Sequence, residues 1–142
     1  MAIRPIRELT MSLPFRVDEY GTIAATIDPS KIWADRVRAV IGTAIGERVY
    51  RPEFGCAAAT SVFETEEETE ALLISEIRNA FSDYLSSCSL EDVTIVIDEQ
   101  TRVINAEVTY TPPNSNTFSL QVGVATINGD QPISEEITWR PL

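Results

Sequence analysis

Apolar residues recur at helical spacing in two segments of the chain. The first segment begins at Asp28-Pro29, where the aspartate can accept hydrogen bonds from free backbone N–H groups and proline suits the first helical position. Its apolar side chains lie three and four residues apart, as on the buried face of a helix: Ile32, Trp33, Val37, Val40, Ile41 and Ile45. Gly46 is expected to end this helix in a left-handed conformation.

A second helix is predicted from Thr65 to the Ser86-Ser87 pair. Thr65 and Glu68 have the spacing of a capping box, and neighbouring glutamates place negative charge at the positive end of the helix dipole. The expected inner face consists of Leu73, Ile77, Ala80, Phe81 and Tyr84.

From Val93 onward the apolar period changes from 3.6 to 2. Three alternating runs follow, separated by turn residues at 98–101 and 112–116, and they predict an antiparallel meander with one apolar face. The alternating residues are Val93, Ile95 and Ile97, then Ile104, Ala106, Val108 and Tyr110, then Phe118, Leu120, Val122 and Val124. An extended segment at 133–139 follows a turn at 128–130. We therefore predict an α+β fold, with two main helices on one face of a three- to four-stranded antiparallel sheet.

The first 27 residues are interpreted as an N-terminal arm and a short hairpin. Phe15–Val17 and Tyr20–Ile27 are extended in character, and Asp18–Gly21 supplies the turn. A length of 142 residues is typical of one domain. We expect a single domain over 1–142, consisting of the arm and hairpin at 1–27, a core at 28–130 and an extended tail at 131–142.

Charge excludes several classes of partner. The chain has 22 acidic and 11 basic residues, no histidine and a formal net charge of −11. This charge opposes binding to nucleic acid or to anionic membranes. Apolar runs are too short for a membrane span and the start lacks a signal-peptide pattern, so a cytoplasmic chain is expected. Cys56 and Cys88 are then expected to be buried, reduced thiols.

The sequence offers little catalytic chemistry. Without histidine there is no Ser-His-Asp or Cys-His arrangement, and the glycines do not have phosphate-loop spacing. The glutamate run at 64–68 points around a helix rather than into one cage, which disfavours a metal site. Glu53 could serve as a glycosidase acid, but Arg48 and Arg51 beside it would lower its pKa. We expect no catalytic residue, no cofactor and no metal.

The segment between the helices, 46–55, has the densest chemistry in the chain. Two arginines, a glutamate, Tyr50 and Phe54 lie between Gly46 and Gly55, whereas an ordinary helix connection is short and polar. Arg48, Arg51 and Glu53 could form one charge cluster that fixes the loop, or the arginines could reach a partner's carboxylate or carbonyl. Both interpretations can hold together.

These residues resemble the inner baseplate wedge and sheath-initiator family of contractile phage tails. The resemblance covers Leu13 to Thr126 and rests on Pro14-Phe15, Gly46-Glu47-Arg48 and Arg51-Pro52-Glu53-Phe54-Gly55. One departure is that many members have Glu-Pro-Arg where the first long strand begins, whereas this chain has Ser89-Leu90-Glu91-Asp92-Val93.

The resemblance implies a structural subunit of the inner baseplate, present in several copies in the virion tail and assembled in the host cytoplasm. Its implied partners are larger wedge proteins, the sheath subunit, and hub, spike or tube neighbours. Its members offer a sheet edge to the sheath arms. Either the strand at 118–124 or the segment at 133–139 would form that edge. The candidate partner-binding residues are Arg48, Arg51, Pro52, Glu53, Phe54, Phe118, Ser119, Gln121 and Gly123.

Two alternative functions remain open from the sequence. One is a stand-alone regulatory adaptor on the same fold, and the other is a lysozyme-like glycoside hydrolase. The neighbouring genes would distinguish the adaptor, and a cell-wall lysis assay would test the hydrolase.

Overall fold

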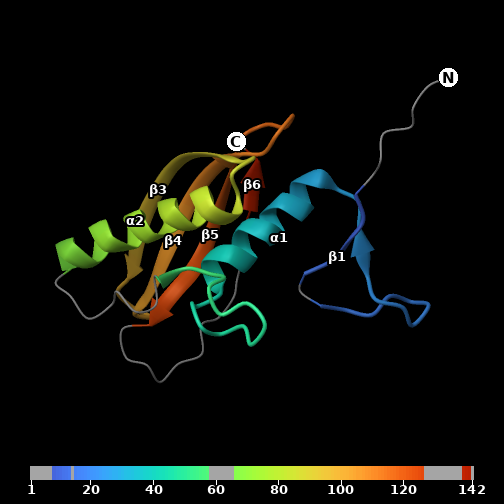
Figure 1. Ribbon diagram of the computed structural model, residues 1–142, viewed down its shortest axis with the longest axis horizontal. Coiled ribbons are helices and arrows are strands. Elements are labelled where there is room, and N and C mark those ends of the chain that lie inside the picture. Colours follow the sequence, from blue (N-terminus) through green and yellow to red (C-terminus); the bar gives the residue numbers. More distant parts are fainter. Residues whose placement is uncertain (1–7, 14, 58–65, 127–138, 142) are drawn as a thin grey trace.

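The computed structural model describes residues 8–13, 15–57, 66–126 and 139–141. Two helices, α1 (Pro29–Gly42) and α2 (Glu66–Tyr84), pack on one face of a four-stranded antiparallel sheet (Figure 1). The sheet has the order β3-β4-β5-β6, and its strands are β3 (Ser89–Asp98), β4 (Val103–Thr111), β5 (Phe118–Thr126) and β6 (Trp139–Pro141). A separate two-stranded sheet pairs β1 (Thr10–Met11) with β2 (Ala25–Thr26). The predicted fold class is confirmed.

The hydrophobic core lies between the helices and the sheet. The predicted inward residues of β4 and β5 are buried, and α1 and α2 contribute the apolar faces that cover them. The cover weakens along the inner face of β3, where Val93 is buried, Ile95 is partly buried and Ile97 is exposed. The largest fully buried side chains include Tyr110, Leu73, Ile77, Leu120, Val37 and Val108.

Helix α1 begins as predicted but ends earlier. Asp28 caps it by accepting a hydrogen bond from the Ser30 backbone N–H at 3.0 Å. The expected continuation through Ile45 to a stop at Gly46 is wrong, because the helix ends at Gly42 and Thr43 is extended. The Thr43 hydroxyl donates to the Ala39 carbonyl at 2.5 Å. Ile45 is therefore exposed in the following loop rather than buried on the helix.

Helix α2 matches its predicted inner face, and Leu73, Ile77, Ala80 and Phe81 are buried. The predicted cap at Thr65 lies outside the described residues, as do the turn at 128–130 and the segment 133–138. No helix within the described ranges is long and apolar enough to cross a membrane.

The N-terminal hairpin is present and turns at the predicted place. Asp18 Oδ1 accepts hydrogen bonds from the backbone N–H groups of Tyr20 and Thr22, both at 2.9 Å, and Gly21 has φ +78°. Tyr20 belongs to this turn rather than to the second strand as expected. The two strands also pair between Thr10–Met11 and Ala25–Thr26. On the first strand this pairing lies farther from the turn than the predicted segment, 15–17.

Candidate partner-binding surfaces

The loop between α1 and α2 is closed by its own backbone hydrogen bonds. Gly46 N–H donates to the Pro52 carbonyl at 2.8 Å, and Glu47 N–H donates to the Ala44 carbonyl at 3.1 Å. The Glu47 carboxylate in turn accepts from the Ala44 N–H at 2.9 Å. The segment is thus a folded loop with a defined base, and Arg48–Arg51 form its tip.

Gly55 makes the close approach that seals the base of the loop. Cys56 N–H donates to the Thr43 carbonyl at 2.9 Å, and Ala44 and Cys56 form a parallel bridge. Gly55 has φ +126°, and a Cβ there would lie 2.3 Å from the Thr43 carbonyl oxygen. Only glycine fits this position without a shift of the backbone.

Phe54 is the internal anchor of the loop. Its ring lies 4.9 Å from the ring of Tyr84 at the end of α2, and the guanidinium of Arg48 lies 4.1 Å from its centroid. Arg51 lies 5.6 Å from the same ring. The Tyr84 hydroxyl donates to the Glu53 carbonyl at 2.6 Å. These contacts connect the loop to α2 and use the arginines as cation–π partners.

The expected three-membered charge cluster is not the arrangement observed. Arg51 Nε and Glu53 Oε1 lie 3.6 Å apart, with side-chain exposures of 60% and 63%, while Arg48 stacks on Phe54. Pro52 contributes its carbonyl to closing the loop. An exposed pair at this distance contributes little to stability.

The tip of the loop carries two apolar side chains that point away from the protein. Val49 is 88% exposed and Tyr50 is 98% exposed. Neither was in the list of candidate partner-binding residues, although Tyr50 was noted from the sequence as part of this loop. Their position midway between the two glycines that close the loop is the signal that could have identified them.

Two of the four candidate residues on β5, Phe118 and Ser119, lie inside the sheet, whereas Gln121 and Gly123 pair with β4 alone in the described residues. The Phe118 side chain is buried, and the first three residues of β5 pair with β6 on one side and β4 on the other. Ser119 donates from its hydroxyl to Glu107 at 3.0 Å. Gln121 and Gly123 pair with Glu107 and Asn105 of β4. The structure does not bring these residues together with the loop residues into one site.

Within the described residues, one edge of the sheet is β3, and the other is formed by β6 beside residues 118–120 and by β5 itself from residue 121 onward. Strand β3 spans ten residues, whereas β6 spans three and ends in a proline. A register shift between Leu90 and Asp92 interrupts the β3–β4 ladder, and the Glu91 carboxylate there accepts from the Thr111 hydroxyl at 3.2 Å.

Both cysteines are buried, reduced thiols, as expected. Burial, together with the nearby Glu91 carboxylate, raises the pKa of Cys88 to about 11, which makes its thiol a poor nucleophile at neutral pH. In the described part of the chain, no three His, Cys, Asp or Glu side chains are arranged to hold a metal ion.

The fold is shared with two solved structures. A Geobacter sulfurreducens protein, provisionally described as a tail lysozyme, superposes with a TM-score of 0.61 at 27% identity, covering 68% of this chain and 89% of that chain. A chain of the six-fold symmetrised anti-feeding prophage baseplate superposes with a TM-score of 0.65 at 23% identity, covering 75% and 86%. The second likeness concerns the fold alone. The structural class is therefore the α+β fold found in a baseplate subunit.

Residues 34–117 match the family described as baseplate wedge protein gp25, which is more than half of the chain. The chain belongs to this family and is a baseplate component of a contractile injection system. The resemblance based on the loop residues is thereby confirmed. The matched region includes the loop, α2, β3 and β4, and it ends one residue before β5. Comparison with curated protein sequences gives no significant match.

Proposed function

We propose that the protein is a structural subunit of the inner baseplate of a contractile tail, which binds larger wedge subunits through the tip of loop 46–55 and offers an edge of its sheet to sheath arms. The observation that carries this proposal is Tyr50, which is almost fully exposed on a loop that is otherwise closed and anchored. In this proposal the protein is located in the virion tail, and several copies are assembled into the baseplate in the host cytoplasm.

The loop is suited to binding because its shape is set before a partner arrives. Its backbone is closed at Gly46 and Gly55, and Phe54 anchors it to α2. Little conformational freedom is then lost on docking. Tyrosine is among the residues most enriched in binding hot spots, where truncation costs about 2 kcal/mol or more. Arg51 and Glu53, both exposed beside the tip, are suited to polar contacts at the rim of the interface.

The sheet edge that we propose for sheath arms is β3. A partner strand adds through backbone N–H and C=O groups, so a long edge supplies more bonds than a short one. Strand β3 has ten residues and its far end carries the exposed Val96 and Ile97. On β6, Pro141 has no N–H to donate. The edge named from the sequence on β5, 118–124, is interior at 118–120, and in the described residues its open part from 121 onward is shorter than β3.

We infer that the protein is not an enzyme. The carboxylate considered for catalysis, Glu53, is exposed and lies next to Arg51, whereas a general acid needs an apolar enclosure. Nothing in the described residues favours a stand-alone adaptor. Release of soluble fragments from purified peptidoglycan, lost in Glu53→Gln, would contradict the non-enzymatic interpretation.

The loop is tested by incorporation of Tyr50→Ser into baseplates. We expect incorporation to fall about tenfold or more while thermal unfolding stays unchanged, because Tyr50 makes almost no contact within the protein. Glu99→Ser, in the exposed turn after β3, is the control and should incorporate normally. Normal incorporation of Tyr50→Ser would remove the loop from the interface.

The edge is tested by proline at Val96 and at Ile97 separately. Successive residues of an edge strand direct their N–H groups alternately to the neighbouring strand and to solvent, so one proline removes a bond to β4 and the other leaves the ladder intact. The proline variant that leaves the β3–β4 ladder intact should stay folded. It should nevertheless fail to nucleate sheath on assembled baseplates, because it lacks an N–H group that a partner strand would use. If it nucleates sheath as well as the parent, β3 is not the docking edge.

A further inference from the structure

The β1–β2 hairpin has its apolar side chains on the outside. Met11 pairs with Ala25 and Val17 pairs with Ile23, so these side chains share one face of the hairpin. All four are on odd-numbered positions, as are Leu9 and Ile27 at the ends of the same strands. The members of this odd face are exposed: Leu9, Met11, Val17, Ile23, Ala25 and Ile27.

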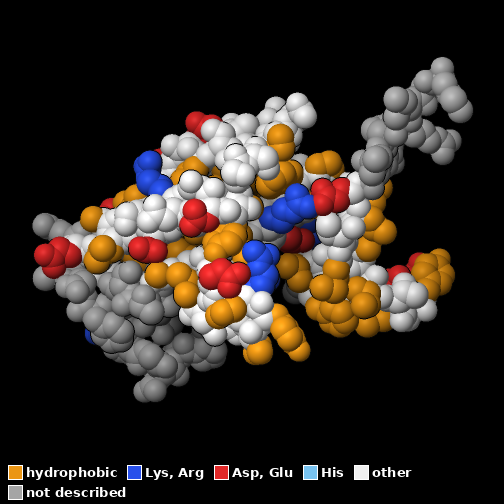
Figure 2. All heavy atoms as spheres, viewed as in Figure 1, with side chains coloured by type: hydrophobic (Ala, Val, Ile, Leu, Met, Phe, Trp, Pro, Cys, Tyr) orange, Lys and Arg blue, Asp and Glu red, His pale blue; other side chains and the backbone are white. Residues whose placement is uncertain are grey.

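The opposite face of the hairpin is small or polar, yet beside β1 and β2 it is the face that is covered, while Arg16 and Thr22 nearer the turn are exposed. Ser12 is buried, and Thr10, Ala24 and Thr26 are partly buried. Ordinary surface hairpins bury the apolar face and expose the polar one. Figure 2 shows hydrophobic side chains gathered over the hairpin at the right of the molecule. Contiguous apolar surface of this kind marks an interaction site rather than scattered exposure.

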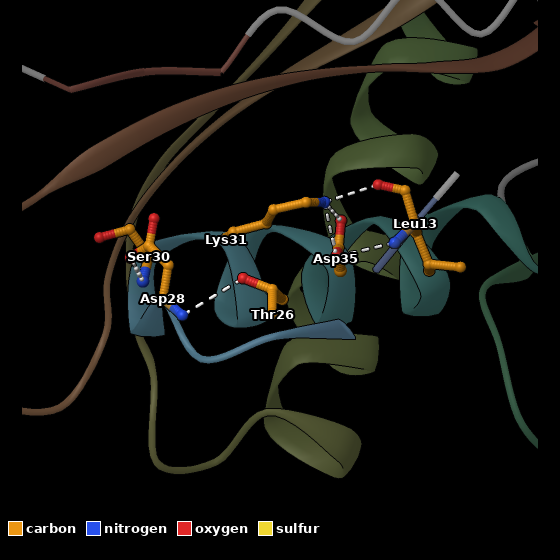
Figure 3. Close-up of polar contacts among 6 residues, drawn as sticks. All are labelled: Leu13, Thr26, Asp28, Ser30, Lys31 and Asp35. Carbon is orange, nitrogen blue, oxygen red and sulfur yellow. Dashed lines mark hydrogen bonds and ion pairs between the residues drawn. The ribbon is translucent and has the colours of Figure 1, made fainter. Parts of the chain in front are cut away.

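Polar contacts hold the hairpin on α1 (Figure 3). The Lys31 ammonium donates to the Leu13 carbonyl at 2.6 Å, and Leu13 N–H donates to the Asp35 carboxylate at 3.3 Å. Lys31 and Asp35 are themselves paired at 3.0 Å with low side-chain exposure. Arg36 of the same helix pairs with Glu8, before β1. The outer face is therefore presented in a fixed orientation, which reduces the entropy lost on binding.

We propose that this outer face docks into an apolar groove with a basic rim on a neighbouring protein subunit of the assembled baseplate, an inference that rests on the proposed function. Tyr20 at the hairpin tip is 82% exposed, and Phe15 is also exposed, so the surface includes the aromatic anchors typical of interfaces. The surface lies before residue 34 and is thus outside the region matched to the family.

Charge selects this partner over a second copy of the chain. Of the four acidic residues in segment 8–28, Glu8 is paired with Arg36 of α1; the other three, Asp18, Glu19 and Asp28, still outnumber the one basic residue, Arg16. The whole chain has a net charge of −11. Two copies would therefore repel each other, whereas a groove lined with lysine or arginine would attract the hairpin and suppress self-association.

Labelling in the assembled particle tests the docking directly. Met11→Cys introduces an accessible thiol on the outer face, while both native cysteines are buried. Its reaction with fluorescein maleimide should slow at least about tenfold in purified baseplates relative to the free protein. Ser82→Cys, on the exposed side of α2, is the control for the labelling reaction in each preparation. Equal labelling of Met11→Cys in both states overturns the proposal.

Carbodiimide coupling tests the basic rim. In baseplates, the exposed Glu19 carboxylate should form an amide with a lysine of another polypeptide, detected by mass spectrometry and absent in Glu19→Gln. Protection of Met11→Cys without any such coupling would overturn the basic rim. A dimer of the purified chain that already protects Met11→Cys would overturn the choice of partner in favour of a second copy.

A comparison of variants separates this inference from the proposed function. The double change Val17→Thr with Ile23→Thr keeps β-branched residues in the hairpin, and it should lower incorporation about tenfold with unchanged thermal unfolding. If Tyr50→Ser loses incorporation but the hairpin variant does not, the hairpin proposal is wrong and the loop proposal stands. If neither loses it, both are wrong.

Discussion

Replacement of Gly55 by alanine should be among the most damaging single changes in the loop. A Cβ at this position would lie 2.3 Å from the Thr43 carbonyl oxygen and 3.0 Å from its carbonyl carbon, and both are backbone atoms that cannot rotate away. Moving Thr43 would disturb its 2.9 Å hydrogen bond from Cys56 N–H. The substitution thus combines an unfavourable φ of +126° with a steric clash.

The expected magnitude is the sum of these two terms. The backbone conformation costs about 1–3 kcal/mol for a residue other than glycine, and forced overpacking costs about 1–3 kcal/mol. The free energy of unfolding should therefore fall by about 2–6 kcal/mol, a large part of the ~5–15 kcal/mol of a typical domain. For a domain of this size, at about 3–4 °C per kcal/mol, the melting temperature should fall by roughly 6–24 °C.

Two other glycines provide matched controls. Gly46 has φ +89° but a Cβ there would meet nothing within 4 Å, so Gly46→Ala should carry the conformational cost alone, about 1–2 kcal/mol. Gly42 is the last residue of α1 and has open space, so Gly42→Ala should raise stability by about 0.4–1 kcal/mol. Urea unfolding followed by circular dichroism measures all three. If Gly55→Ala loses no more stability than Gly46→Ala, the close approach to Thr43 does not hold the loop.

Four further expectations concern stability. Burial raises the pKa of Cys88 from 9.0 to about 11, so the folded state holds the thiol proton more tightly than the unfolded state does. The contribution of this group to the free energy of unfolding should be complete below pH 9 and fall toward pH 11. Urea unfolding of Cys88→Ala should show a flatter decline over this pH range. Tyr110→Phe removes a buried hydroxyl that has no hydrogen-bond partner among the described residues, so calorimetry should show equal stability or a gain of up to about 1 kcal/mol. The single variants Arg51→Ala and Glu53→Ala, and the double variant, should each lower the free energy of unfolding by at most about 1 kcal/mol. A coupling energy between the two changes well above this value would contradict the interpretation of Arg51 and Glu53 as an exposed, weak ion pair. Tyr84→Phe loses the 2.6 Å bond to the Glu53 carbonyl and should cost about 1 kcal/mol and speed amide exchange in the loop; unchanged exchange would contradict its anchoring role.

The features that the sequence predicted well are those determined by near neighbours. The Asp28 cap acts on a backbone N–H two residues away, and the strand alternation depends only on the pleat of each strand. The hairpin turn at Asp18 is equally local. The end of α1 was missed because Ile45 continues the helical spacing, while the actual end depends on the approach of Gly55 to Thr43 from the far side of the loop.

The partner-binding residues were harder to predict because exposure is a tertiary property. The sequence placed Tyr50 and Phe54 in one loop, but only contact with Tyr84 determines that Phe54 is held inside and Tyr50 points outward. Phe118 was predicted to face inward on its alternating strand and is buried, which conflicts with its place among the candidate partner-binding residues. The interior position of residues 118–120 of β5 depends on pairing with β6, which no local pattern encodes.

The anchoring of loop 46–55 also has a consequence for the order of folding. The β3–β4–β5 meander joins neighbouring segments by short turns and can form early. The loop requires the end of α1, for the contact between Thr43 and Gly55, and the end of α2, for the contacts of Tyr84 with Phe54 and Glu53. It is therefore expected to reach its final shape only after both helices have docked. A baseplate that binds the subunit through this loop would therefore incorporate fully folded subunits and not partly folded ones. No separate quality-control factor would be needed.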